Sequence, residues 1–278
     1  MKKVLFGLLA VMLLSGFIIP SSKMASLMKA QKGLDVLVLN GTAFFNLGKD
    51  YVNTPVPCRV IIKSNGSVRQ DYQFPKARVT VLNEGLHQTT LVNKVRMSSP
   101  LPLFSQNNLF TVLVELYLSD NPQRIFNEIG LNQTKVAYGL ANDRAAYIIG
   151  DDNDQLFIDN EDTVPLMYRM TYGSSQILSV VKSYLTGAQL AYNTAKIKNA
   201  NGNNGTPVSV EVDSATQTTM TLPRTVELYN GDALVQRWEF KDAVLFHTDA
   251  DIKRLLLTPA EVKKLPVSPQ VVSPFMLF

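Results

Sequence analysis

The chain has 278 residues, of which 46% are hydrophobic and 18% charged, so it is long and apolar enough to bury a substantial core, and general disorder is not expected. The formal net charge of +4 is small for this length, and Lys and Arg are scattered along the chain, so a nucleic-acid-binding surface is not expected either. Cys58 is the only cysteine, which excludes an intrachain disulfide and a multi-cysteine zinc site.

The first 22 residues have the pattern of an export signal. Lys2 and Lys3 precede a compact apolar run that is short for a transmembrane helix, and the sequence becomes small and polar at Ser21. Because the stretch Ile18–Ser22 contains no Ala-x-Ala cleavage site, an uncleaved anchor stays an alternative. We therefore expect a signal peptide or anchor at 1–22, one domain at 23–266 and an apolar tail at 267–278.

The first half of the domain predicts a short helix and then strands. Met24, Leu27 and Met28 share one helical face, with Gly33 placed to end the helix. The Asn65-Gly66 pair predicts a tight hairpin. Runs rich in β-branched and aromatic residues predict strands at 34–40, 42–47, 58–63, 68–74, 78–82 and 88–92.

Two helices are expected to interrupt the strands. Residues 107–118 are apolar on every side of a helix apart from Thr111 and Glu115, so this helix should be covered all round. Asp120-Asn121-Pro122 has the composition of a helix start, and Gly130 ends a second short helix at 123–129.

Strands resume in the second half of the chain. They are expected at 135–140, 144–149, 156–158 and 164–170, and at 176–184 a strand is favoured although a helix fits nearly as well. The Asn/Gly tract at 199–205 indicates a surface loop, and Asn230-Gly231 predicts a hairpin between 225–229 and 234–246. Thr258-Pro259-Ala260-Glu261 predicts a last helix at 259–265.

Strands and helices do not alternate regularly, so a parallel sheet is not expected. The economical architecture is one curved antiparallel sheet with helices on one side, an α+β fold. In the strand at 164–170, Leu166, Tyr168 and Met170 are expected to share one apolar face, opposite Met167 and Arg169.

The stretch Ala146–Met170 resembles a known family. A strand ended by Gly150, a strand ending in Ile158-Asp159 and a strand opening at Pro165 resemble the pattern of periplasmic lipoprotein carriers of the LolA/LolB type, and a weaker match runs from about Ala25 to Ala260. The resemblance implies a periplasmic, monomeric protein with an incompletely closed β-barrel, whose helices form a lid over a hydrophobic cavity for the acyl chains of a lipoprotein or another lipid.

Patterning alone favours a solid core between the helix at 109–118 and the sheet, whereas the resemblance favours a lipid-sized cavity there. Leu109, Leu113 and Leu116 would be the cavity-facing stripe of the lid. In the related carriers an early-strand arginine hydrogen-bonds the lid, and Arg69 is the candidate here. The predicted lipid-binding residues are Leu109, Phe110, Leu113, Leu116, Val136, Tyr138, Leu156, Ile158, Leu166, Tyr168 and Trp238.

No catalytic, cofactor or metal site is predicted. His87 and His247 are the only histidines, no nucleophile-elbow motif accompanies them, and the acidic run Asp151–Asp154 fits a turn better than a calcium loop. An envelope-sensing or protein-interaction module on the same fold, with an envelope protein as partner, is the alternative function. The loop at 199–205, together with the exposed apolar end expected at 271–278 of the tail, would dock this partner. An enzyme is the third possibility.

Overall fold

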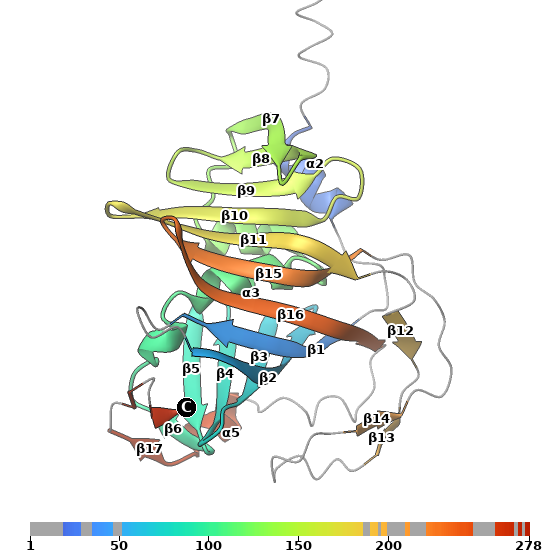
Figure 1. Ribbon diagram of the computed structural model, residues 1–278. Coiled ribbons are helices and arrows are strands. Elements are labelled where there is room, and N and C mark those ends of the chain that lie inside the picture. The colour runs from blue at the N-terminus through green and yellow to red at the C-terminus, as the bar shows by residue number, and fades with distance from the viewer. Residues whose placement is uncertain are drawn as a thin grey trace, which may run out of the picture.

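The computed structural model describes residues 19–28, 35–46, 52–185, 190–193, 196–198, 209–211, 221–246, 259–269, 272–273 and 276–278. Fifteen strands of this described part form one sheet (Figure 1). In spatial order fourteen of them are β17 (Val267–Ser268), β6 (Val95–Met97), β5 (His87–Val92), β4 (Arg78–Glu84), β3 (Ser67–Gln73), β2 (Val52–Lys63), β1 (Val36–Phe45), β16 (Ala233–Phe246), β15 (Leu222–Asn230), β11 (Ser175–Leu185), β10 (Pro165–Tyr172), β9 (Asp154–Asp159), β8 (Arg144–Gly150) and β7 (Val136–Ala141). The fifteenth, β12 (Leu190–Asn193), pairs with β16, and β13 (Lys196–Lys198) and β14 (Ser209–Glu211) pair with each other.

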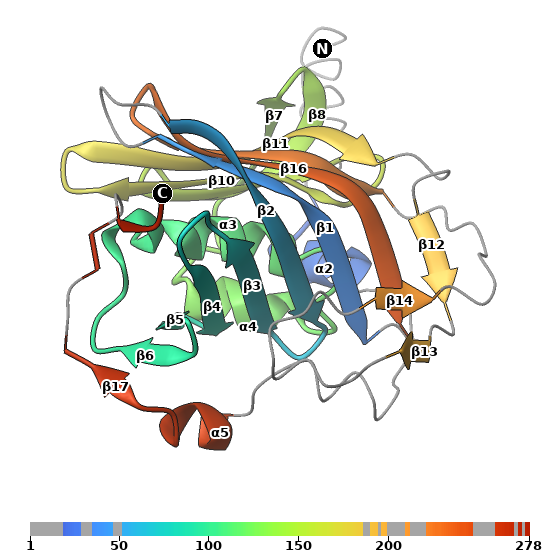
Figure 2. The same cartoon turned by 60° about the horizontal axis from the view of Figure 1, so that its bottom comes forward.

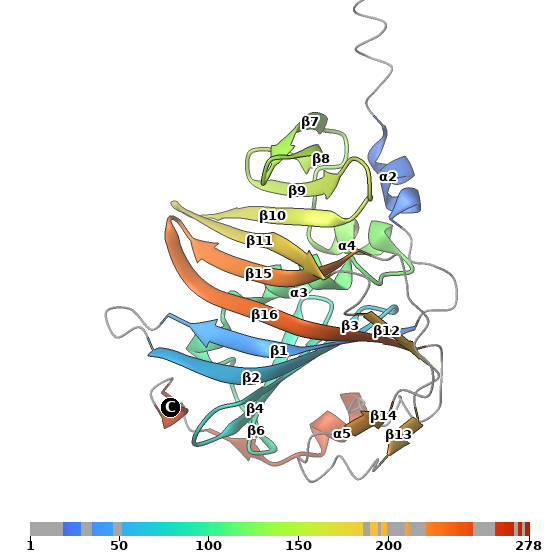
Figure 3. The same ribbon diagram turned by 45° about the vertical axis from the view of Figure 1, so that its right-hand side comes forward.

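The sheet is curved and antiparallel, apart from the parallel pairs β17–β6 and β12–β16. Its outermost strands, β17 and β7, are not paired with each other in the described residues, so hydrogen bonds do not close the barrel. The helices are α2 (Ser21–Leu27), the 3-10 turn η1 (Pro102–Phe104), α3 (Asn107–Glu115), α4 (Pro122–Glu128) and α5 (Pro259–Lys263). Figures 2 and 3 show α3 inside the curve of the sheet. The predicted α+β class, an incompletely closed antiparallel barrel with helices on its concave side, is confirmed.

The turns predicted from Asn-Gly pairs are present. Gly66 and Gly231 both have positive φ, +97° and +57°, and they connect β2 to β3 and β15 to β16. The side chain of Asn121 accepts a hydrogen bond from the backbone N–H of Arg124 at 3.1 Å, so it caps α4 as its composition predicted. The segment at 176–184 is strand β11, as favoured.

The two strands expected at 34–40 and 42–47 form one strand, β1. The pairing of β1 with β16 shifts register between Asn40 and Gly41, so this glycine marks a bulge within the strand where the sequence pattern predicted an interruption. A Cβ atom at position 41 would lie 2.1 Å from the carbonyl oxygen of Glu239, so only glycine allows β16 to approach this closely. Strands β6 and β17 had no counterpart in the prediction.

The sheet has a large apolar inner face and a smaller apolar patch on its outer face. The predicted common face of Leu166, Tyr168 and Met170 is wrong for Leu166. Tyr168 and Met170 pack in the main core, whereas Leu166 packs with Phe157 in the outer patch. The pairing of β10 with β9 shifts register between Pro165 and Met167, and this irregularity turns Leu166 to the outer face.

The segment 267–278, expected to be an exposed apolar tail, lies in part on the domain. β17 extends the sheet beyond β6, and Leu277 is 1% exposed. Residues 1–18, Gly33, the loop at 199–205 and His247 lie outside the described residues. Within the described ranges, none of the helices has the length and apolar character needed to span a membrane.

Candidate functional site

Helix α3 is buried on every side, as its apolar pattern predicted. Leu109, Leu113 and Leu116 are buried, but so are the residues between them, so the expected stripe is not distinguished from the rest of the helix by burial. The helix contacts β2 and β3 on one side and β10, β11 and β15 on the other. Its side chains and the inner sheet face form one continuous core, which means that α3 occupies the interior of the barrel.

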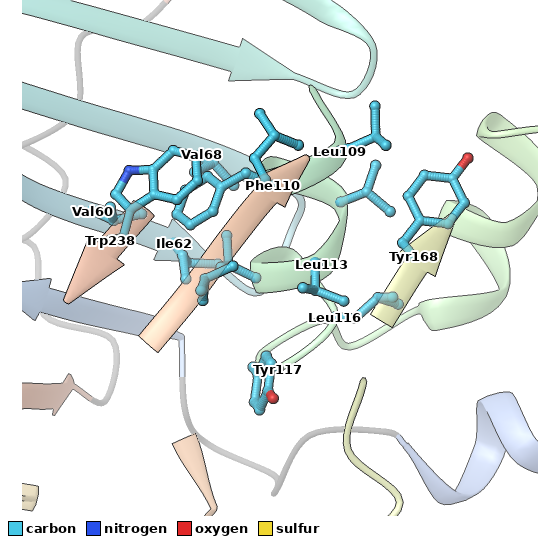
Figure 4. Close-up of a cluster of buried hydrophobic side chains, with 14 of the residues drawn as sticks. Val60, Ile62, Val68, Leu109, Phe110, Leu113, Leu116, Tyr117, Tyr168 and Trp238 are labelled. Atoms are coloured by element: carbon cyan, nitrogen blue, oxygen red, sulfur yellow. The ribbon is translucent and has the colours of Figure 1, made fainter. Parts of the chain in front are cut away.

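Aromatic rings join α3 to the sheet. The ring of Phe110 stacks on the indole of Trp238 with centroids 3.8 Å apart and an interplanar angle of 14°. The indole N–H of Trp238 donates to the hydroxyl of Tyr72 at 3.0 Å. Figure 4 shows Phe110 turned toward Trp238, while Leu113 and Leu116 lie on the side of Tyr168.

The other predicted lining residues divide into three groups. Leu156, Ile158 and Tyr168 are buried in the same core as α3, and Val136 packs against it. Tyr138 is 57% exposed on the edge strand β7, and Leu166 lies on the outer face as described above. The structure therefore gathers Leu109, Phe110, Leu113, Leu116, Val136, Leu156, Ile158, Tyr168 and Trp238 around one interior.

Three polar residues at a spacing of four run down α3: Asn107, Thr111 and Glu115, here called the polar spine. All three are buried. Because residues i, i+4 and i+8 lie on one side of a helix, this spacing could have been read from the sequence as a polar line on an apolar helix. The polar spine meets buried polar groups of the sheet and a half-buried arginine of α4.

The upper half of the polar spine is hydrogen-bonded to β3 and β4. The hydroxyl of Thr111 accepts from Gln70 Nε2 at 3.1 Å and from Asn83 Nδ2 at 2.9 Å, and it donates to the carbonyl of Asn107 at 3.0 Å. Asn107 Nδ2 in turn donates to Gln70 Oε1 at 2.7 Å, and this oxygen also accepts from the Tyr72 hydroxyl at 2.6 Å. Gln70 is thus the residue of β3 that holds α3.

Arg69, the predicted lid-gating residue, is adjacent to Gln70 in sequence and belongs to the other face of β3. Its Nε donates to Asp71 Oδ1 at 2.9 Å, and Arg59 contacts the same carboxylate at 3.0 Å. Burial by itself would raise the pKa of Asp71, but Arg69, Arg59 and the hydroxyl of Thr80 together hold that pKa below its usual value. The contact of Arg69 with Asp71 lies on the outer face of the sheet, and the hydrogen bonds from β3 to α3 come from the neighbouring Gln70.

The lower end of the polar spine is an ion pair. Glu115 accepts from Arg124 of α4, whose guanidinium also contacts Glu128 at 2.7 Å. The side chain of Glu115 is only 4% exposed, and this burial raises its pKa to about 7 even though Arg124 opposes the shift. The carboxylate therefore reaches its protonation midpoint near neutral pH.

The free energy of unfolding is expected to fall as the pH rises from about 4.5 to about 7, because Glu115 holds its proton more tightly in the folded than in the unfolded state. The difference corresponds to roughly 3 kcal/mol at about 1.4 kcal/mol per pKa unit. In Glu115→Gln this fall should disappear. Urea denaturation at a series of pH values measures it.

Glu128→Gln is the matched control, because Glu128 shares the Arg124 partner but is 36% exposed, and the pH dependence should persist in it. A wild-type stability that rises over the same pH interval would show that the attraction of Arg124 outweighs the burial of Glu115.

The remaining chemical candidates do not come together. His87 is exposed at the start of β5. Asp151 accepts hydrogen bonds from the Asn132 side chain at 3.0 Å and from the backbone of Asn153 at 3.1 Å, the arrangement of a turn. Among the described residues there is no group of three or more His, Cys, Asp or Glu side chains that could hold a metal ion.

No family model and no curated protein matches the chain. A LolA superfamily protein from Nitrosomonas europaea is similar over 84% of this chain and 97% of its own, with a TM-score of 0.44 and 10% identity. A putative outer membrane lipoprotein-sorting protein domain from Vibrio parahaemolyticus is similar over 88% of this chain and 95% of its own, with a TM-score of 0.46 and 9% identity.

Proposed function

We propose that this protein is an exported, non-enzymatic carrier of the periplasm that acts as a monomer and shields the acyl chains of a lipoprotein or another lipid. The observation that carries the proposal is an apolar helix, α3, lying inside a sheet whose outer strands are not paired with each other in the described residues. Such a helix can leave the interior without breaking the backbone hydrogen bonds of the sheet.

The contacts that hold α3 support this role. Its backbone belongs to no strand ladder, and its polar attachments are the side-chain hydrogen bonds to Gln70 and Asn83 and the ion pair with Arg124. A small number of side-chain contacts can be exchanged with water when the helix moves, each at a net cost of about 1 kcal/mol. The apolar face left behind by α3 would then be covered by the ligand.

Burial of an acyl chain would offset the polar contacts that α3 loses. Each buried methylene contributes about 0.8 kcal/mol, so a chain of ~14 carbons contributes on the order of 10 kcal/mol before ordering costs. No catalytic group or cofactor is needed, because the ligand is covered and released without chemical change.

Native mass spectrometry and lipid extraction of the purified protein test the proposal. We expect a co-purified lipid, or a fatty acid that exchanges onto the protein under mild conditions, at one ligand per chain. Because Trp238 is the only tryptophan and stacks on α3, a fatty acid with a brominated chain should quench its fluorescence on binding. A protein that neither retains nor takes up a lipid would contradict the proposal.

A protein-interaction module that senses the state of the envelope is the second candidate, and β7 favours it. This edge strand presents Tyr138 and Leu140, which are 57% and 71% exposed, beside backbone groups that can pair with an extended segment of another protein. If this second hypothesis is right, the double variant Tyr138→Ser, Leu140→Ser should lose its binding to an envelope protein. If the protein is a carrier, the same double variant should bind lipid as the unchanged protein does.

A further inference from the structure

The end of the interior near the turn between β3 and β4 is lined by aromatic rings. Four buried rings, here called the aromatic cluster, lie there: Phe45 of β1, Tyr72 of β3, Phe74 directly after β3, and Phe104 of η1. The ring of Phe45 lies 5.3 Å from that of Phe74 and 5.8 Å from that of Phe104. The aromatic cluster is thus a compact apolar site at one end of the barrel.

Residues 276–278 cover this site. The backbone N–H of Lys76 donates to the carbonyl of Leu277 at 3.1 Å, and the Leu277 side chain joins the core with the aromatic cluster. The ring of Phe278 meets that of Phe74 edge to face at 5.0 Å. Met276 is 64% exposed, so the two residues after it make the apolar contact.

The covered site is continuous with the interior that α3 occupies. The rings of Tyr72 and Phe104 are 5.1 Å apart, Tyr72 is hydrogen-bonded to Trp238, and Trp238 stacks on Phe110 of α3. An apolar chain that replaced Leu277 and Phe278 would therefore extend directly along the inner face toward α3.

We propose that residues 276–278 are an internal competitor, which covers the mouth through which an acyl chain reaches the interior. This inference rests on the proposed function and adds where the ligand binds first and what it displaces. The pairing of β17 with β6 keeps the segment close, because Arg96 N–H donates to the Pro266 carbonyl at 2.8 Å and Ser98 N–H to the Ser268 carbonyl at 3.2 Å. An acyl chain buries more apolar surface than these two side chains, so it can displace them.

The test compares the full chain with the double variant Leu277→Ser, Phe278→Ala, using a dansyl-labelled fatty acid and a brominated fatty acid that quenches Trp238. If the segment covers the mouth about nine-tenths of the time, the double variant should bind about tenfold more tightly. Met276→Ser, which changes an exposed neighbour, should bind as the unchanged protein does. A peptide with the sequence of residues 273–278 should weaken binding to the double variant.

Equal or weaker binding by the double variant, with quenching of Trp238 in both proteins, would overturn the competitor and leave the carrier function intact. Absence of fatty-acid binding by both proteins would overturn the carrier function and this inference together. A peptide that does not compete, although the double variant binds more tightly, would also overturn the assignment of the mouth to the aromatic cluster.

Discussion

Replacing Leu113 with Glu is expected to unfold the domain. Leu113 is completely buried in the middle of α3, and the core around it is apolar. A carboxyl group there has to be buried without a partner, which costs at least about 4 kcal/mol, a large share of the 5–15 kcal/mol that stabilises a typical domain. Circular dichroism during heating should show loss of the cooperative transition or a melting temperature lowered by more than roughly 10 °C.

Leu140→Glu is the matched control, because it makes the same change at an exposed position of β7. Its free energy of unfolding should stay within about 0.5 kcal/mol of the unchanged protein. If Leu113→Glu instead keeps its melting temperature and loses fatty-acid binding, α3 can leave the interior at little cost even when no ligand takes its place. If it keeps both, the placement of α3 in the site is wrong.

Most of the fold could be predicted because its signals are local. Asn-Gly at 65–66 and 230–231 forces a turn, and the alternation along β3 and β4 reflects one buried face. The two-residue strand β17 could not be predicted, because it exists only through its parallel pairing with β6, far away in sequence. The same distance hides the contact of Leu277 with the turn at Lys76.

Bulges explain two differences from the prediction: the strand break expected at Gly41 and the face expected for Leu166. The pairing of a strand with its neighbour shifts by one residue at Gly41 and again at the Pro165–Met167 step. A strict alternation of inward and outward residues ignores such a shift, so it assigns the wrong face to residues beyond it. Leu166 was misplaced for this reason.

The sequence pattern also contains the polar residues that join α3 to β3. Val68, Gln70 and Tyr72 alternate on one face of β3, so the inward polar residue is Gln70, and Arg69 must face the other way. Likewise, Asn107, Thr111 and Glu115 recur at a spacing of four on α3. Polar side chains on an otherwise apolar, buried face need hydrogen-bond partners. Matching Gln70 of β3 with the polar spine of α3 therefore predicts the hydrogen bonds that hold this helix.

Gly150, which ends a strand in the sequence pattern at 146–170, is expected to tolerate no side chain. Its φ is +122°, and a Cβ atom would lie 1.9 Å from the carbonyl oxygen of Asp154. The backbone cannot easily relax, because the N–H of Gly150 donates to Lys135 O at 3.0 Å and the N–H of Asp151 donates to Asp154 O at 3.0 Å. Gly150→Ala should therefore lose at least about 3 kcal/mol of unfolding free energy.

Gly173→Ala separates the steric clash from backbone strain. Gly173 also has a positive φ, +60°, but nothing lies within 4 Å of a Cβ atom there, so only the left-handed backbone is penalised, by about 1–2 kcal/mol. Urea denaturation of both variants measures the difference, which is the cost of the contact with Asp154. Equal losses would mean that the turn between β8 and β9 opens to accept the methyl group, and that this glycine serves only its backbone conformation.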